Sequence, residues 1–244
     1  MTAGPQSQRR TNPARRHPAP SPRRLADLPV WVLRSPDGEP LNCVLVSGPG
    51  GLIVINSGLS LRHGKALKRA LAALSDRPVR AIVYPHHHAR YCRGTAALVD
   101  PGAVAASEVV VLAPKGWSGQ PDPAEVVPPN LLVHRECILQ LAGVTVHVLP
   151  VGGNGHTGAG IYLPEHRVAM LPDDPDMWRY RPGPRAGTPL ADLAELLLPL
   201  PFRYVLGSRL PPLDAPHGRI LLANYRYAAR GGVPRRARSP KPGS

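Results

Sequence analysis

Residues 82–94 read Ile-Val-Tyr-Pro-His-His-His-Ala-Arg-Tyr-Cys-Arg-Gly, so that an apolar run leads directly into three adjacent histidines. The apolar part, from Val79 to Tyr84, has the length and composition of a buried β-strand. A strand end is a rigid place for ligands, and alternate residues such as His86 and His88 project to the same side. Because neutral imidazole is the commonest metal ligand, this pattern predicts a metal site at the end of the strand.

The positive charge of the chain is concentrated at its two ends. The formal net charge is +14, yet residues 1–24 carry six arginines, residues 226–244 carry five arginines and one lysine, and neither segment has an acid. Between them lie 18 basic and 16 acidic side chains, a charge of only +2. Polar, proline-rich ends cannot bury enough apolar surface to offset the entropy of ordering. The sequence therefore predicts a disordered arm at 1–28, one domain at 29–229 and a disordered tail at 230–244.

The composition also bears on partners and location. Basic ends can bind nucleic acid through phosphate contacts, but no aromatic is interleaved with the arginines of residues 1–24, which favours a solubilising role. Three widely spaced cysteines do not form a disulfide framework, no export signal is legible, and the longest apolar runs fall short of the ~20 residues of a membrane span. We expect a cytoplasmic protein without a membrane span that acts on a small molecule; the oligomeric state stays open.

Hydrophobic patterning predicts an α/β fold in which strands and helices alternate, then hairpins follow, then α/β units return. This order is typical of two packed sheets with helices outside. Strands are expected at 29–33, 42–46, 52–55, 79–84, 103–106, 131–134, 136–141, 144–149, 159–163, 167–171 and 204–206, helices at 61–75, 92–98, 189–198 and 217–229, and a surface loop at 113–130.

Five motifs, in this order, resemble the landmarks of the metallo-β-lactamase superfamily. The resemblance covers about residues 29–227 and implies an αββα sandwich, in which two mixed β-sheets are flanked by helices. Two of the motifs sit at strand ends early in the chain, and three come late. They are Val54-Ile55-Asn56-Ser57-Gly58 (the family's V-I-D-T-G), residues 85–91 (T-H-x-H-x-D-H), Gly155-His156-Thr157-Gly158 (G-H-T-x-G), residues 168–173 (a hairpin ending in Asp) and Val205-Leu206-Gly207-Ser208 (v-x-G-H).

The resemblance implies a ligand set. His86, His88 and His156 match the three imidazoles of the family's first metal position, and Asp173 matches the carboxylate that bridges to the second. Three histidines with one open coordination position form a catalytic zinc arrangement. Such a zinc ion supplies hydroxide at neutral pH.

Three family ligands of the second metal position are replaced, by Arg90, Tyr91 and Ser208. An arginine stays positively charged and repels a cation, so we expect one zinc ion, a degenerate site and an empty second position. Arg90 either pairs with Asp173 or holds an anionic group of the substrate. Tyr91 either binds a substrate oxyanion or fills the vacated space. Cys92 is either a substitute ligand or, as we favour, a buried inert thiol.

Two functions follow from this pattern. The first is a mononuclear zinc hydrolase of an ester, lactone, thioester, amide or sulfate ester, with Asp173, Arg90 and Tyr91 as catalytic residues. The alternative is a non-catalytic member of the fold with a binding, accessory or regulatory role, which the lost ligands favour and the retained imidazoles oppose. Residues 78–84 and 163–168 resemble alkylsulfatase-like branches of the superfamily. A two-metal nuclease is disfavoured because the second metal position is lost.

Overall fold

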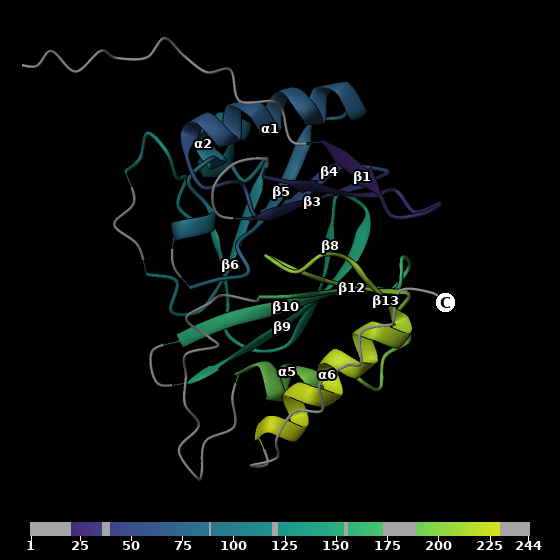
Figure 1. Ribbon diagram of the computed structural model, residues 1–244. Helices are drawn as coiled ribbons and strands as arrows, with labels where there is room; N and C mark the ends of the chain where they lie inside the picture. The colour runs from purple at the N-terminus through teal and green to yellow at the C-terminus, as the bar shows by residue number, and fades with distance from the viewer. Residues whose placement is uncertain are drawn as a thin grey trace, which may run out of the picture.

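The fold consists of two β-sheets packed face to face, with helices on both outer faces (Figure 1). The computed structural model describes residues 21–35, 40–87, 89–118, 122–153, 156–172 and 189–229. Within these ranges no helix is both long enough and apolar enough to cross a membrane. The expected αββα sandwich of two mixed sheets is confirmed.

The first sheet has seven strands in sequential order, β1 to β7. Its first four strands pair antiparallel, and the pairs from β4 to β7 are parallel. Parallel neighbours need crossover connections; helices form part of the connections from β4 to β5 and from β5 to β6. The bounds are β1 Pro22–Arg24, β2 Val30–Arg34, β3 Asn42–Gly48, β4 Gly51–Ile55, α1 Leu61–Leu74, β5 Val79–Val83, the 3-10 helix η1 Ala89–Tyr91, α2 Thr95–Leu98, α3 Pro101–Ala105, β6 Val110–Pro114 and β7 Leu131–Val133.

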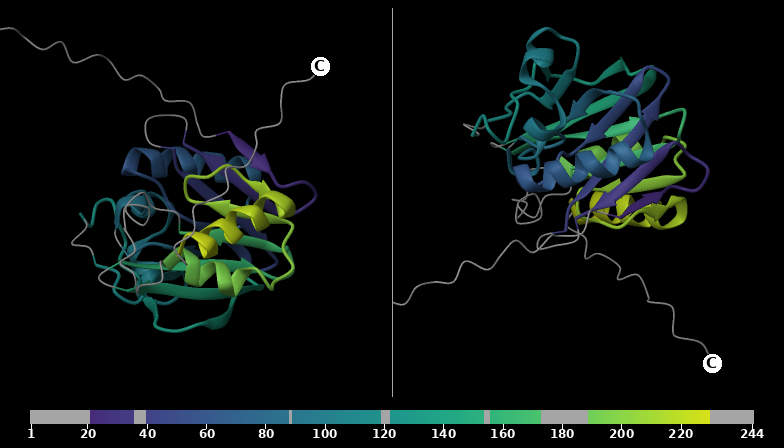
Figure 2. Two further views of the ribbon diagram at one scale, coloured as in Figure 1. Left: turned by 60° about the horizontal axis from the view of Figure 1, so that its bottom comes forward. Right: turned by 90° about the horizontal axis from the view of Figure 1, so that it is seen from above.

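The second sheet has six strands in the order β13-β12-β11-β10-β9-β8. All its pairs are antiparallel except β11 with β12. Two helices lie side by side on its outer face, opposite to the face that meets the first sheet (Figure 2). The bounds are β8 Cys137–Leu141, β9 Val144–Gly153, β10 His156–Leu163, β11 Val168–Leu171, α5 Pro189–Leu197, β12 Tyr204–Gly207, β13 Leu213–Asp214 and α6 Ala215–Ala229.

The alternation of side chains along the strands divides the interior into layers. In β3, Val44 and Val46 point into the core between the two sheets, while Cys43 and Leu45 point to the outer core beneath α1. Successive residues of a strand face opposite sides, so one strand that is buried on both faces serves two cores. A third core lies between the second sheet and the helices α5 and α6.

Two predicted elements differ from the structure. Residues 103–106, expected as a strand, lie at the end of α3, whose start is fixed by Asp100: its carboxylate accepts a hydrogen bond from the amide of Gly102 at 3.0 Å. Pro101 occupies the first helical position, where its missing N–H costs nothing. The expected 113–130 loop begins too early, because β6 extends to Pro114. The Asp-Pro capping signal and the helix preference of the following alanines act together here.

The folded domain also begins earlier in the sequence than predicted. Residues 22–24 form β1, which pairs with β2, and Leu25 and Leu28 are buried in the core between the sheets. The fold therefore includes residues that composition assigned to the basic arm. Residues 1–20 and 230–244, the remaining parts of the predicted arm and tail, lie outside the described residues.

Candidate functional site

The predicted site residues lie where strand ends of both sheets meet. Asn56 directly follows β4, and His86 follows the parallel neighbour β5. In the second sheet, Pro172 and Ser208 directly follow the parallel pair β11 and β12, and β10, antiparallel to β11, begins at His156. Carboxyl ends of parallel strands collect at one edge of a sheet, which is where α/β proteins bind ligands.

Backbone contacts join the three segments that carry the predicted ligands. His86 forms an isolated antiparallel bridge with Gly158, and the amide of Ala159 donates to the carbonyl of Pro85 at 2.8 Å. A Cβ added to Gly158 would lie 3.0 Å from the ring of Pro172 and 3.3 Å from the carbonyl oxygen of Pro85. Thus the residues next to His86, His156 and Asp173 touch one another, although the histidines are 70 positions apart in sequence.

Not every predicted ligand is placed. His88 and Asp173 lie outside the described residues, and so does the side chain of His156, whose backbone begins β10. His86 is placed, and its side chain is only 1% exposed. The described residues contain no cluster of three or more potential metal-ligating side chains. Imidazoles on two converging strand ends, with an aspartate next to Pro172, nevertheless fit one metal ion in donor chemistry and in backbone placement.

A buried polar chain holds His86 from the side of β12. The Nε2 atom of His86 lies 2.9 Å from Oγ of Ser208. The side-chain amide of Asn56 donates to this Oγ at 3.1 Å and to the carbonyl of Asn42 at 3.0 Å. Asn42 in turn donates its side-chain amide to the carbonyl of Gly207 at 2.8 Å. These bonds tie β3, β4 and β12 to the loop after β5.

The sequence did not reveal this series of buried hydrogen bonds. Ser208 was recognised only as a departure from the family histidine, and its partner His86 lies 122 residues earlier. The role of Asn42 was missed altogether. Its one visible signal was an asparagine in a run of apolar strand residues, where a buried amide needs hydrogen-bond partners.

Tyr91 and Arg90 occupy different environments. Tyr91 is fully buried, and its ring meets the His86 ring edge-on with 4.7 Å between the centroids. This contact supports the space-filling alternative for Tyr91. Arg90 is exposed, with its guanidinium carbon 5.9 Å from the centroid of the Tyr91 ring. Because Asp173 is not described, an Arg90–Asp173 pair stays a prediction.

Cys92 is fully buried behind Tyr91, in the core beneath α1. Burial, together with the neighbouring thiol of Cys43, raises the pKa of the Cys92 thiol well above its ordinary value. Since metals bind the thiolate, a raised pKa opposes ligation. The position agrees with the favoured alternative, a buried inert thiol, and all three cysteines are free of disulfides.

The turn after β4 is fixed in an unusual conformation. Asn56 has φ +59°, a left-handed conformation that asparagine tolerates better than most residues. Its amide donates to the carbonyl of Val83 at 3.1 Å, and the next two amides, of Ser57 and Gly58, both donate to the carbonyl of Tyr91 at 3.0 and 3.1 Å. The turn that carries Asn56 is thereby clamped onto η1, next to the site.

Two histidines near the surface predict a loss of stability in acid. Burial lowers the pKa of His63, at the start of α1, and that of His166 below the ordinary 6.5. As the pH falls through 6.5, the unfolded chain therefore binds these protons before the folded chain does. We expect the free energy of unfolding to fall between pH 7.5 and 5.5, by at most about 1.4 kcal/mol per pH unit for each histidine.

Urea unfolding at the two pH values measures this loss. The variant His63→Gln should lose less stability on acidification than the natural protein, whereas replacement of the exposed His134 with glutamine should leave the loss unchanged. A His63→Gln variant with the same pH dependence as the natural protein would show that His63 is not responsible.

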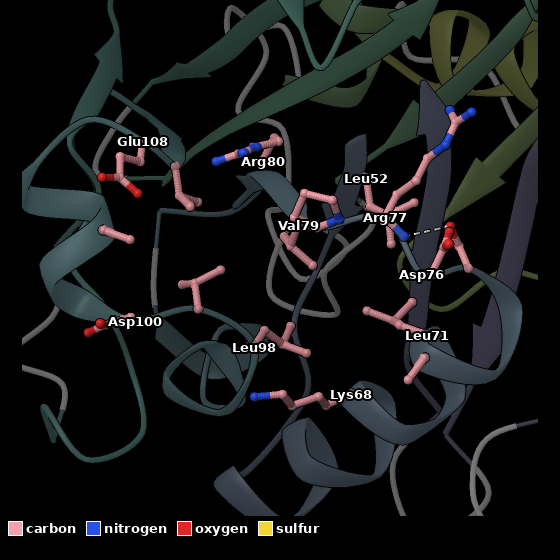
Figure 3. A pocket seen from close by; sticks show the side chains of 16 residues that line it. Leu52, Lys68, Leu71, Asp76, Arg77, Val79, Arg80, Leu98, Asp100 and Glu108 are labelled. Atoms are coloured by element: carbon pink, nitrogen blue, oxygen red, sulfur yellow. Dashed lines mark hydrogen bonds between the residues drawn. The ribbon is translucent and has the colours of Figure 1, made fainter. Parts of the chain in front are cut away.

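A cavity of about 450 Å³ lies away from this site, at the amino ends of β4 and β5. Its floor is apolar and includes Leu52, Leu71 and Leu98, and its rim carries three basic and three acidic side chains (Figure 3). None of the predicted ligands lines it. The formal charges of these six side chains sum to zero.

Comparisons with known proteins agree with the motifs. The family model described as "Metallo-beta-lactamase superfamily" matches residues 36–171, more than half of the chain. A linear primary-alkylsulfatase of a Pseudomonas species is 32% identical over 69 residues, which cover 28% of this chain and 13% of that protein.

Solved structures show the same fold at low sequence identity. The stereoselective inverting sec-alkylsulfatase of a Pseudomonas species is 20% identical with a TM-score of 0.67, over 82% of this chain and 40% of that one. A metallo-β-lactamase of Pseudomonas aeruginosa in the mono-zinc form is 13% identical with a TM-score of 0.62, over 88% of this chain and 99% of that one. This chain thus spans less than half the length of either alkylsulfatase. The family match over most of the two-sheet core, together with the ordered motifs at its strand ends, shows that the chain belongs to the metallo-β-lactamase superfamily.

Proposed function

We propose that this protein is a mononuclear zinc hydrolase that acts on sulfate esters. The observation that carries the proposal is the convergence of His86, the start of β10 at His156 and the segment ending at Pro172. This placement fits His86, His88, His156 and Asp173 as the groups that hold one metal ion. The likeness to two alkylsulfatases supports a sulfate ester over the other esters, lactones, thioesters and amides.

In this proposal each residue has a defined task. Zinc, when bound, acts as a Lewis acid and makes water acidic enough to supply hydroxide near neutral pH. Asp173 accepts a hydrogen bond from the attacking water and orients it. Arg90, exposed at the edge of the site, binds the sulfate oxygens, for which a planar guanidinium provides paired donors. Tyr91 holds the His86 ring by packing against it, a positioning role instead of a catalytic one.

A single zinc ion is proposed because three residues replace the family ligands of the second metal position. Arg90 brings a fixed positive charge, the fully buried Tyr91 brings bulk, and Ser208 already bonds to His86. A hydroxyl group and a phenol ring are poor replacements for imidazole as zinc ligands.

The alternative is a non-catalytic protein with a binding, accessory or regulatory role. It is favoured by one observation: the Nε2 atom of His86 is hydrogen-bonded to a neutral hydroxyl inside the protein. In either case we keep the proposal of a cytoplasmic protein. The two fully buried cysteines, Cys43 and Cys92, and the absence of a disulfide among all three agree with a reducing compartment. Nucleic-acid binding through the basic ends stays disfavoured.

Elemental analysis of the full chain, purified without chelator, tests the metal. We expect about one zinc ion per chain and, because an imidazole ligand is removed, a loss of at least half of this zinc in His156→Ala after dialysis. His134→Ala, the same change at an exposed histidine, is the matched control and should keep its zinc. Zero zinc in the natural protein would favour the non-catalytic alternative, and two ions would contradict the account of the second position.

A further inference from the structure

The direction of the hydrogen bonds around Ser208 is determined by the groups that surround it. The carbonyl of Asn42 can only accept, so the group of Asn56 that faces it must be the side-chain NH2. The second hydrogen of this NH2 points to Oγ of Ser208. Ser208 therefore accepts one hydrogen bond from Asn56, and its own hydrogen needs a different acceptor.

The Ser208 hydrogen has one acceptor among the described residues, the Nε2 atom of His86 at 2.9 Å. Ser208, Asn56 and His86 are all at most 1% exposed, so water does not compete for these groups. Buried polar groups are almost always paired, and among the described residues the hydrogen of the Ser208 hydroxyl finds a partner only when Nε2 accepts it. A neutral imidazole that accepts at Nε2 carries its proton on Nδ1.

We propose that Ser208, oriented by Asn56, holds the Nε2 atom of His86 in a hydrogen bond that a metal ion must displace, so that Ser208 sets the metal affinity of the site. The inference builds on the proposed zinc site and adds a residue that regulates it. Ser208 stands where relatives have a metal-binding histidine; here it competes with the metal for a ring nitrogen. The natural protein then binds zinc more weakly than its three imidazoles would allow.

The tautomer of His86 tests the hydrogen bond without any metal. Nitrogen NMR spectra of the metal-free full chain, labelled at histidine and recorded well above the ordinary imidazole pKa, distinguish the two tautomers. The His86→Gln variant identifies the signals. We expect the proton on Nδ1 in the natural protein and a shift toward the Nε2–H form in Ser208→Ala. An Nε2–H signal in the natural protein would overturn the inference.

Zinc affinity, measured by competition with a chelating indicator, tests the consequence. Loss of one neutral hydrogen bond should let Ser208→Ala bind zinc about 5-fold more tightly than the natural protein. The matched control is Ser57→Ala, since Ser57 is equally buried and bonds to Thr95 instead of His86; its affinity should not change. Zinc binding that appears only in Ser208→Ala would also support the competition.

Weaker zinc binding by Ser208→Ala would contradict the inference. If Ser208 instead supports a metal bound through the other ring nitrogen, Ser208→Ala should bind zinc 10- to 100-fold more weakly, and the inference is wrong. A natural protein and a Ser208→Ala variant that both bind no zinc would contradict the proposed function and the affinity claim. The tautomer measurement would still decide whether Ser208 donates to His86.

Discussion

Gly94→Ala is expected to lower the free energy of unfolding by more than about 3 kcal/mol. Gly94 lies between η1 and α2, where the chain passes directly under α1. A Cβ at this position would overlap the carbonyl oxygen of Ser57 and lie 2.7 Å from Cα of Gly64 in α1. The contacts are backbone atoms, which cannot rotate away, so α1 and the turn carrying Asn56 would have to move. Chemical unfolding followed by circular dichroism measures the loss.

The matched control is Gly102→Ala. Gly102 lies within α3, and the nearest atom to its added Cβ is a carboxylate oxygen of Asp100 at 3.5 Å, an ordinary contact. Alanine is favoured over glycine inside a helix by up to about 1 kcal/mol, so this variant should be as stable as the natural protein or slightly more stable. Similar stabilities for Gly94→Ala and Gly102→Ala would show that the close packing of α1 is not as the structure describes it.

His86→Ala is expected to lower kcat/KM for a sulfate ester by at least about 1,000-fold, because loss of a ligand removes several kcal/mol of transition-state stabilisation. The assay compares a panel of alkyl sulfates, carboxylic esters and lactones with the natural protein and the variant. Circular dichroism must show that the variant is folded, because His86 is buried and bonded to Ser208.

His87→Ala is the neighbouring control. It makes the same replacement one residue later, at a half-buried side chain to which we assign no role in the reaction. Its activity should stay within about fivefold of that of the natural protein. Equal losses in both variants would assign the effect to the shape of the loop, and full activity in His86→Ala would remove His86 from the proposed site.

Two elements with strong local signals were predicted well, whereas the apolar strand β6, Val110–Pro114, was not predicted. The amphipathic segment at residues 61–75 is α1, which ends at Leu74, and the strand before the histidines is β5, which ends at Val83. Both depend on hydrophobic periodicity, which the sequence displays directly. The strand expected at 103–106 was wrong because alanine favours a helix over a strand and a helix cap precedes these residues. The β1 strand was missed because residues 22–24 are polar and show no hydrophobic pattern. Their extended conformation comes with pairing to β2.

The sequence by itself determined the family, the two-layer α/β class and the residues that are candidates for the metal, because motifs and periodicity are local properties. Only the tertiary structure decided what surrounds them. It showed that Tyr91 is packed against His86 and that Ser208, Asn56 and Asn42 form one buried chain. These contacts join residues as far as 152 positions apart. Hydrogen-bond partners of buried groups are chosen by how sheets and turns pack, and no local pattern records that choice.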